Sequence, residues 1–205
     1  MGKDGAVRQP KQSRGIQMKA KILATAERLF VDRGFFATTT NEIAKAADVS
    51  IGSLYSYFAD KDAILTALLK QNHQYFMSVF DEMQSEANTL LRQDDLRGWL
   101  DWLIRRLVRL HEGKKGLLRE LNVLRYARPD VAAVLDAGSE RVRLALLDDL
   151  EKHYPTAGAS DIEAVAVVLR ASVSAIVDQV VFADSPVSDE RIIATGVDML
   201  YNCLN

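Results

Sequence analysis

Apolar side chains recur at intervals of three or four residues along almost the whole chain, and this helical period is what most constrains the fold. No segment shows the alternation of apolar and polar residues that a half-buried strand needs. Only four prolines interrupt the 205 residues, so long helices can form. The sequence therefore predicts an all-α protein of about nine helices, covering residues 17–33, 40–47, 51–58, 60–87, 96–111, 117–126, 129–153, 161–183 and 189–204.

Composition narrows the class of protein further. Hydrophobic residues make up 48% of the chain and charged residues 26%, which is typical of a globular protein with a real core. No apolar run approaches the roughly 20 residues of a membrane-spanning helix, and the N-terminus has no apolar signal core. The sequence thus predicts a cytoplasmic protein with no membrane partner. Cys203 is the only cysteine, so no intrachain disulfide and no multi-cysteine metal site is expected. No cofactor is predicted.

Charge is unevenly distributed along the chain. Residues 1–80 hold eleven Lys and Arg against seven Asp and Glu, whereas residues 81–205 hold fifteen against twenty-one. Most of the positive excess lies in residues 1–21, ahead of and within the first predicted helix. A basic arm in this position can neutralise phosphates, although a solubilising, disordered leader has the same composition.

Two short helices joined by a tight turn form the clearest functional pattern. Thr39 and Glu42 have the spacing of a capping box at the start of the first helix. Ala44 is small enough to let a second helix approach closely. Residues 48–50 then form the turn, and Ser50 caps the second helix. This is helix-turn-helix geometry, in which the second helix enters the major groove of DNA.

The second helix carries side chains suited to reading DNA. Gly52 has no side chain, so a sugar-phosphate backbone can pass close to it. Ser53 and Tyr55 are placed to meet base edges, whereas Tyr57 and Lys61 are placed to meet phosphate oxygens. Two apolar residues of the same helix are expected to face the protein core, namely Leu54 and Phe58.

An uninterrupted run of matching residues resembles the N-terminal signature of the tetracycline-repressor (TetR) family: Gly34-Phe35-x-x-Thr38-Thr39-x-x-x-Ile43-Ala44-x-x-Ala47-Asp48-Val49-Ser50-x-Gly52-x-Leu54-Tyr55-x-Tyr57-Phe58-x-x-Lys61-x-x-Ile64-Leu65. The resemblance covers residues 16–76. Phe35 stands where the family usually has tyrosine, and Asp48 stands where it usually has glycine. The aspartate suggests a slightly strained or differently angled turn.

The resemblance implies a regulator, in most such proteins a repressor, that binds a palindromic operator in double-stranded DNA as a homodimer. Residues 16–76 would form the DNA-binding domain and residues 77–205 a helical domain for ligand binding and dimerisation. A small-molecule effector, whose identity the sequence does not reveal, would change the separation of the two DNA-reading heads. The positions that match the family's DNA contacts are Thr39, Thr40, Ser50, Ile51, Gly52, Ser53, Tyr55, Tyr57 and Lys61.

Candidate effector contacts lie in the second half of the chain. Trp99, Trp102 and Leu103 follow one helix, and tryptophans there can fill a core or line a ligand cavity. His111 and Tyr126 could supply polar groups inside such a cavity, although either could equally be a satisfied or solvent-facing residue.

The segment 161–183 is apolar nearly all round and must be covered on more than one side. Arg170, Ser174 and Asp178 share one of its faces, and a buried guanidinium there needs a partner. An internal ion pair, a subunit contact or an acidic effector would each serve, and the residues could face either the pocket or a dimer interface. The segments 161–183 and 189–204 are predicted to form the dimer interface.

An enzyme is not expected, because the three histidines are scattered and no glycine-rich phosphate loop is present. The predicted function is a ligand-responsive DNA-binding regulator. The alternative is a DNA-binding helical protein that responds to no small molecule, for which a solid core in the second domain would argue.

Overall fold

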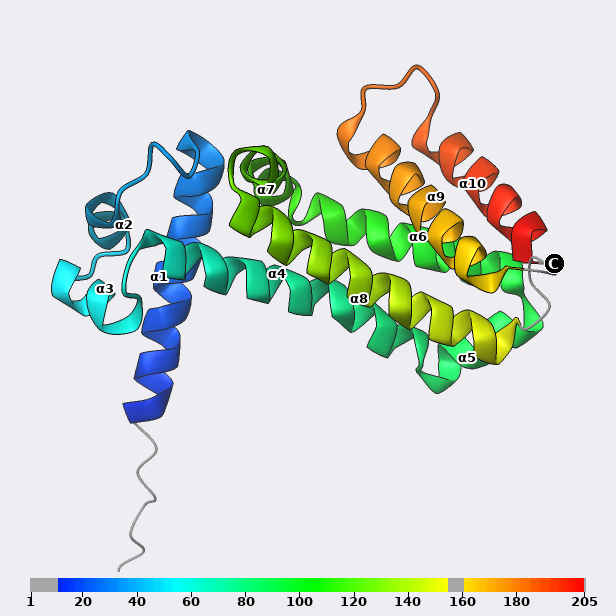
Figure 1. The fold of residues 1–205 in the computed structure, drawn as a ribbon, viewed down its shortest axis with the longest axis horizontal. Helices are drawn as coiled ribbons and strands as arrows, with labels where there is room; N and C mark the ends of the chain where they lie inside the picture. Colours follow the sequence, from blue (N-terminus) through cyan, green and yellow to red (C-terminus); the bar gives the residue numbers. More distant parts are fainter. Residues whose placement is uncertain (1–10, 155–160, 205) are drawn as a thin grey trace, which may run out of the picture. The chain divides into compact units, whose positions relative to one another are not determined.

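A computed structural model describes residues 11–154 and 161–204, and in these ranges it contains ten α-helices and no strand (Figure 1). The all-α prediction is therefore confirmed. The helices are α1 (Lys11–Arg33), α2 (Thr40–Ala46), α3 (Ile51–Tyr57), α4 (Lys61–Met83), α5 (Glu86–Asp94), α6 (Leu96–Glu112), α7 (Lys115–Ala127), α8 (Pro129–His153), α9 (Ile162–Phe182) and α10 (Asp189–Leu204).

The additional helix is α5, where the sequence pattern predicted the end of one long helix and a polar loop. The break has a local cause, because the Ser85 side chain accepts a hydrogen bond from the Asn88 amide and caps a new helix. The Asn88 side chain also donates to the Glu82 carbonyl at 3.0 Å, which satisfies the preceding helix end. The helix α1 also begins earlier than predicted, at Lys11 instead of residue 17.

The chain divides into two compact units, residues 1–71 and residues 72–205. In the first unit, α1 packs on α2 and α2 packs on α3. Ala44 and Ala47 are both buried, and their small side chains allow α3 to approach α2 closely, as the sequence predicted. The largest fully buried side chains of this unit are Ile22, Phe30, Ile43, Leu54 and Ile64.

In the second unit, α6 packs against α5, α9 and α10, while α8 packs against α7 and α9. Gly196 lets α10 approach α9 closely, because a Cβ atom at this position would lie 2.6 Å from Cδ1 of Ile176. The buried core of the unit includes Trp99, Leu100, Ile104, Leu110, Leu150, Leu169, Val177, Ile193 and Leu200.

A buried ion pair joins α5 to α8 in this unit. One nitrogen of Arg92 donates to both carboxylate oxygens of Asp149 at 3.0 Å, and the two side chains are only 4% and 6% exposed. The Arg92 guanidinium also lies over the Trp99 ring, 5.3 Å from its centroid. Gln84 makes a longer hydrogen bond to the same carboxylate, at 3.4 Å. Among the described residues Arg92 is a buried arginine, whereas Arg170, for which the sequence suggests a buried guanidinium, is half-buried within one protomer.

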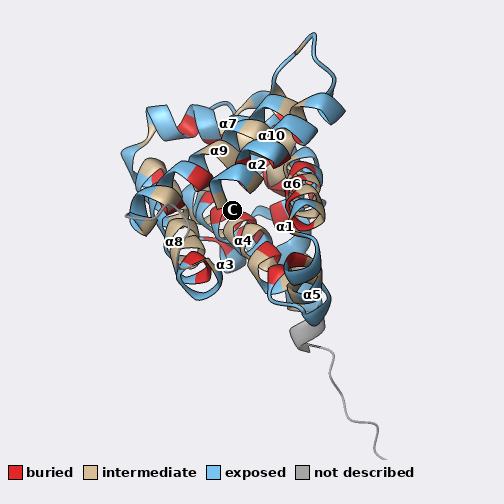
Figure 2. Ribbon diagram, turned by 90° about the vertical axis from the view of Figure 1, so that its right-hand side faces the viewer, coloured by how far each residue is buried: buried red, intermediate tan, exposed pale blue. Residues whose placement is uncertain are grey.

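The expectation that no apolar run is long enough to cross a membrane is wrong for α9. This helix is long and apolar enough to do so by length and composition alone, with a mean hydropathy of 1.8 over an 18-residue window. Only 22% of that window is buried within the chain, so much of its apolar surface is open to solvent in a single protomer. Figure 2 shows exposed residues along α9 and α10.

Candidate nucleic-acid interface

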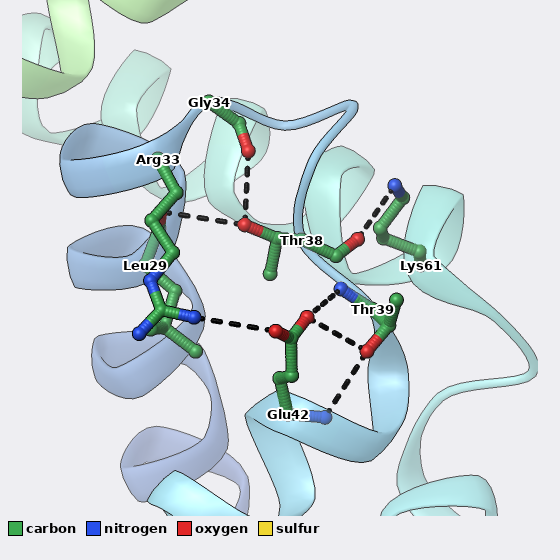
Figure 3. A network of polar contacts seen from close by, with 7 residues as sticks. All are labelled: Leu29, Arg33, Gly34, Thr38, Thr39, Glu42 and Lys61. Carbon is green, nitrogen blue, oxygen red and sulfur yellow. Dashed lines mark hydrogen bonds and ion pairs between the residues drawn. The ribbon is translucent and has the colours of Figure 1, made fainter.

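The start of α2 is fixed by a reciprocal capping network (Figure 3). The Thr39 hydroxyl accepts from the Glu42 amide at 3.3 Å, and the Glu42 carboxylate accepts from the Thr39 amide at 2.8 Å. Arg33, at the end of α1, pairs with the same carboxylate at 3.2 Å. The hydrogen bonds from Thr39, and then the charges of Arg33 and Lys61, lower the pKa of Glu42. The predicted capping box is therefore present.

The turn between α2 and α3 follows the predicted pattern. Asp48 adopts a left-handed backbone conformation with φ of 50°, the only non-glycine residue with positive φ in the described ranges. The Val49 amide donates to the Ala44 carbonyl at 3.0 Å and closes the end of α2. The Ser50 side chain then accepts from the Ser53 amide at 3.0 Å and caps α3. Aspartate tolerates this conformation better than most residues, which explains its presence where glycine is usual.

One face of α3 is buried and the other is exposed, as the sequence predicted. Leu54 and Phe58 are buried in the first unit, at 0% and 4% exposure. Ile51, Tyr55 and Tyr57 are exposed, and Gly52 and Ser53 lie in the same solvent-facing turn. The α3 surface thus presents hydroxyl groups and aromatic rings to solvent.

A hydrogen bond joins the exposed face of α3 to the start of α2. The Tyr55 hydroxyl lies 3.1 Å from the Thr40 hydroxyl, so these two candidate contacts act as one unit. The Ser50 hydroxyl donates to the Ser53 hydroxyl at 2.9 Å, which leaves the Ser53 proton able to point outward. The structure therefore brings eight of the nine candidate DNA contacts to the start of α2 and to α3, and the ninth, Lys61, begins α4.

Lys61 is engaged differently from the other eight. Its ammonium group donates to the carbonyl oxygens of Phe35 at 2.7 Å and Thr38 at 2.8 Å. It also lies 4.3 Å from the centroid of the Phe35 ring. Local sequence patterns do not predict these contacts, because they join residues more than twenty positions apart.

The helix α1 brings further positive charge to this unit. Residues 11–15 of the predicted basic arm are helical, whereas residues 1–10 lie outside the described residues. The ammonium of Lys19 lies 5.6 Å from the centroid of the Phe58 ring, just beyond the end of α3. A Cβ atom added to Gly15 would lie 3.8 Å from the Tyr57 hydroxyl, so this part of α1 runs beside α3.

Comparison with known proteins agrees with this geometry. Residues 22–68 match the model of the bacterial regulatory proteins of the tetR family, and residues 95–204 match that of the tetracyclin repressor-like C-terminal domain. The chain belongs to the TetR family. It is a DNA-binding transcriptional regulator of the helix-turn-helix type, and the family consists of regulators rather than enzymes.

Individual TetR-family relatives support the match over different lengths. The regulator HbdR of Aromatoleum sp. (strain CIB) is 43% identical over 54 residues, which cover 26% of this chain and only 24% of HbdR. The probable regulator ArpR of Pseudomonas putida is 28% identical over 196 residues, covering 90% of this chain and 91% of ArpR. The structure of Salmonella enterica GusR superposes with a TM-score of 0.72 at 23% identity, covering 98% of this chain and 99% of GusR. This last likeness concerns the fold.

The candidate effector residues of this TetR-family chain lie in different environments. Trp99 is buried and its indole nitrogen has no hydrogen-bond partner in the described part of the chain, while Trp102 and Leu103 are half-buried against the same core. His111 donates from Nδ1 to the Leu107 carbonyl at 2.8 Å. Burial lowers the pKa of His111 and keeps the ring neutral near neutral pH. Tyr126 is 91% exposed, so it does not line the interior of this protomer.

The polar residues of α9 are not buried within this TetR-family protomer. Arg170 is half-buried, and Ser174 and Asp178 are exposed. The Ser174 hydroxyl lies 3.4 Å from an oxygen of Asp178, and the charge of Asp178 acts on His111. The structure shows no ion pair between Arg170 and Asp178 among the residues described. Within one protomer Arg170 thus has no ion pair with Asp178, and its other expected partners, a subunit contact or an acidic effector, stay predictions.

Proposed function

We propose that this chain is a ligand-responsive repressor that binds a palindromic DNA operator as a homodimer and is released by a small-molecule effector. Residues 16–76 would form its DNA-binding domain and residues 77–205 its ligand-binding and dimerisation domain. Such a regulator would act in the cytoplasm. The observation that carries the proposal is the exposed polar and aromatic face of α3, held on a buried scaffold and capped by Ser50.

This face divides into two kinds of DNA contact. Tyr55 and Ser53 would meet base edges, because they lie in the first turns of α3, which enter the groove first. Tyr57 would meet a phosphate oxygen, which positions the helix but carries no sequence information. The other residues proposed to meet the operator are Thr39, Thr40, Ser50, Ile51 and Gly52.

Selection on randomised DNA tests the division. The full-length chain should recover a palindrome whose half-sites are spaced by about 34 Å or a multiple, one turn of the double helix. Tyr55→Ala and Ser53→Ala should change the preferred bases, whereas Tyr57→Phe should weaken binding to all sequences alike. An unchanged preference in Tyr55→Ala would contradict this orientation of α3.

The surface of α9 and α10 favours a second copy of the chain as its partner. Val167, Val168 and Met199 are exposed on these helices, with 45%, 57% and 62% of their surface open to solvent. Ala171 and Ala175 lie further along α9 and are also exposed. An apolar surface of this kind on a soluble regulator indicates a protein contact, and small residues allow close helix packing.

Ala175→Glu tests the dimer interface. A charge placed there would be buried without a partner at a cost of several kcal/mol, so the variant should sediment as a monomer and lose operator binding while keeping its helical content. Ala133→Glu is the matched control, since Ala133 is exposed on α8 and not on the proposed interface. A dimeric, DNA-competent Ala175→Glu would show that other helices make the contact.

The effector site is proposed between α6, which carries the half-buried Trp102, Leu103 and neutral His111, and the helices packed against it. Trp99 would form its wall, and Arg170, Ser174 and Asp178 would lie at its edge or in the dimer interface. An effector can act only through different affinities for two states, so effector and operator must weaken each other by the same factor.

A thermal-shift screen of small hydrophobic molecules, with tryptophan fluorescence as a second readout, tests this site. Repetition of the screen with operator DNA present should lower the affinity of any hit. Equal affinity for free and DNA-bound protein would contradict the switch. If no molecule binds and the second unit has a solid core, the chain is instead a DNA-binding protein without an effector.

A further inference from the structure

Lys61 begins α4, yet its charged group is committed to the turn that connects α1 to α2. We propose that Lys61 supports DNA reading as a positioning residue that holds this turn, and does not act by neutralising a DNA phosphate. The inference rests on the proposed DNA-reading face of α3. It departs from what the TetR resemblance implies for this position.

The contacts of the ammonium group are short and of two kinds. Nζ donates to the carbonyl of Phe35 at 2.7 Å and to the carbonyl of Thr38 at 2.8 Å. The Phe35 ring adds a cation–π contact at 4.3 Å. Hydrogen bonds from a charged donor are stronger than neutral ones, and Lys61 is half-buried, so water competes only in part.

The turn that Lys61 holds is itself closed from the other side. The Thr38 hydroxyl donates to the Gly34 carbonyl at 2.9 Å and to the Leu29 carbonyl at 3.3 Å (Figure 3). Gly34 has φ of 84°, a conformation that side chains rarely adopt. Thr38 is 1% exposed. The turn is therefore held by hydrogen bonds to α1 and Gly34 on one side and to Lys61 on the other.

The DNA-reading residues begin directly after this turn. Thr39 caps α2, and the hydroxyl of the next residue, Thr40, is bonded to that of Tyr55 on α3. A displaced turn would move Thr40, and Tyr55 would lose its partner. Lys61 can thus affect the reading face through the turn without touching DNA. Movement of its ammonium to a phosphate would remove a charged donor from two carbonyls that face it.

The salt dependence of binding separates the two roles. Lys61→Met keeps the length of the side chain and removes the charge. We expect about a tenfold loss of affinity for the selected operator, within the range for charged hydrogen bonds, and an unchanged slope of log K against log salt. Loss of a phosphate contact would instead reduce that slope by about 0.9. Lys70→Met, an exposed lysine on the same helix, controls for the loss of one charge.

A second variant tests whether a positive charge at position 61 is enough for wild-type affinity for DNA. Lys61→Arg keeps the charge but replaces a compact ammonium with a planar guanidinium that serves a phosphate at least as well. We expect its affinity to remain below that of the wild type. Full recovery of affinity in Lys61→Arg, or a reduced slope in Lys61→Met, would overturn the positioning role.

NMR of the wild-type chain decides the matter even if Lys61→Met does not fold. The scalar couplings between the Lys61 ammonium nitrogen and the Phe35 and Thr38 carbonyl carbons should persist when the selected duplex is added. Their replacement by a coupling to phosphorus would overturn the inference. Failure of the wild type to bind any duplex would count against the proposed operator binding, whereas the other outcomes concern Lys61 alone.

Discussion

The two units of the chain are stabilised by different kinds of contact. In the first, residues 1–71, polar side chains cap helix ends and close turns, and many of their partners lie within four positions in the sequence. In the second, residues 72–205, the most buried polar contact joins Arg92 to Asp149, which are 57 positions apart. The first unit buries Ile43 of α2 and Leu54 of α3, whereas the second leaves a large part of the apolar surface of α9 exposed, including Val167 and Val168.

This difference suits the tasks proposed for the two units. DNA reading requires a few hydroxyl and aromatic groups at fixed positions, and caps and tight turns set these positions locally. Assembly requires a broad apolar surface, which α9 and α10 supply. Local caps and turns can complete the polar unit within one chain, whereas an exposed apolar surface such as that of α9 is typical of a contact with another molecule.

Removal of one member of the buried ion pair should destabilise the second unit more than any other change proposed for it. Arg92→Met leaves Asp149 buried without its cation, which costs about 3–5 kcal/mol in comparable pairs. The free energy of unfolding, measured in urea, should fall by this amount. The double variant Arg92→Met with Asp149→Leu should recover most of the loss. Equal stability of the wild type and Arg92→Met would show that water reaches Asp149.

Close packing of α10 on α9 should be the next most sensitive feature. Gly196→Ala places a Cβ atom against Ile176, and overpacking of this kind costs about 1–3 kcal/mol. The gain in helix propensity from alanine, about 1 kcal/mol, offsets part of that loss.

Two variants control the Gly196→Ala measurement. Gly15→Ala gains the same propensity without a clash and should leave stability unchanged or raise it. Ile176→Val removes the nearest atom, Cδ1, and should reduce the penalty when combined with Gly196→Ala. A stabilised Gly196→Ala would mean that α9 and α10 separate easily.

In the first unit, loss of the cap of α2 should have a smaller effect. Thr39→Ala removes the hydroxyl that accepts from the Glu42 amide and should cost about 1 kcal/mol. Faster hydrogen exchange at the Glu42 amide would locate the change in the first turn of α2. Thr39→Ser keeps the hydroxyl and should retain most of the stability. Equal losses in both variants would assign the effect to the Thr39 methyl group.

The smallest expected effect is on the acid stability of α2. Glu42 has its pKa lowered by the hydrogen bonds from Thr39, so its contribution is present above its ordinary pKa and lost as pH falls through the lowered value. In an NMR titration, Thr39→Ala should raise the pKa of Glu42 toward its ordinary value. Arg33→Met should raise it less, because the charge of Arg33 is the weaker cause. The reverse order would make the ion pair dominant.

The amino-acid sequence determines most of the first unit because its signals are local. The spacing of Thr39 and Glu42 predicted a capping box, and Ser50 after Asp48 predicted a turn and a second helix. The apolar residues Leu54 and Phe58 predicted which face of α3 is buried. Each of these features depends on residues within about four positions of one another, where backbone geometry leaves few alternatives.

Contacts between distant residues were decided by the tertiary structure. The pairing of Arg92 with Asp149, the position of the Lys61 ammonium on two carbonyls and the exposure of Tyr126 all depend on how separate helices meet. A helical period shows that a side chain lies on an apolar face, but not which helix covers that face. Sequence alone therefore predicted that α9 must be covered, whereas the packing of the chain leaves much of its surface open to solvent within one protomer.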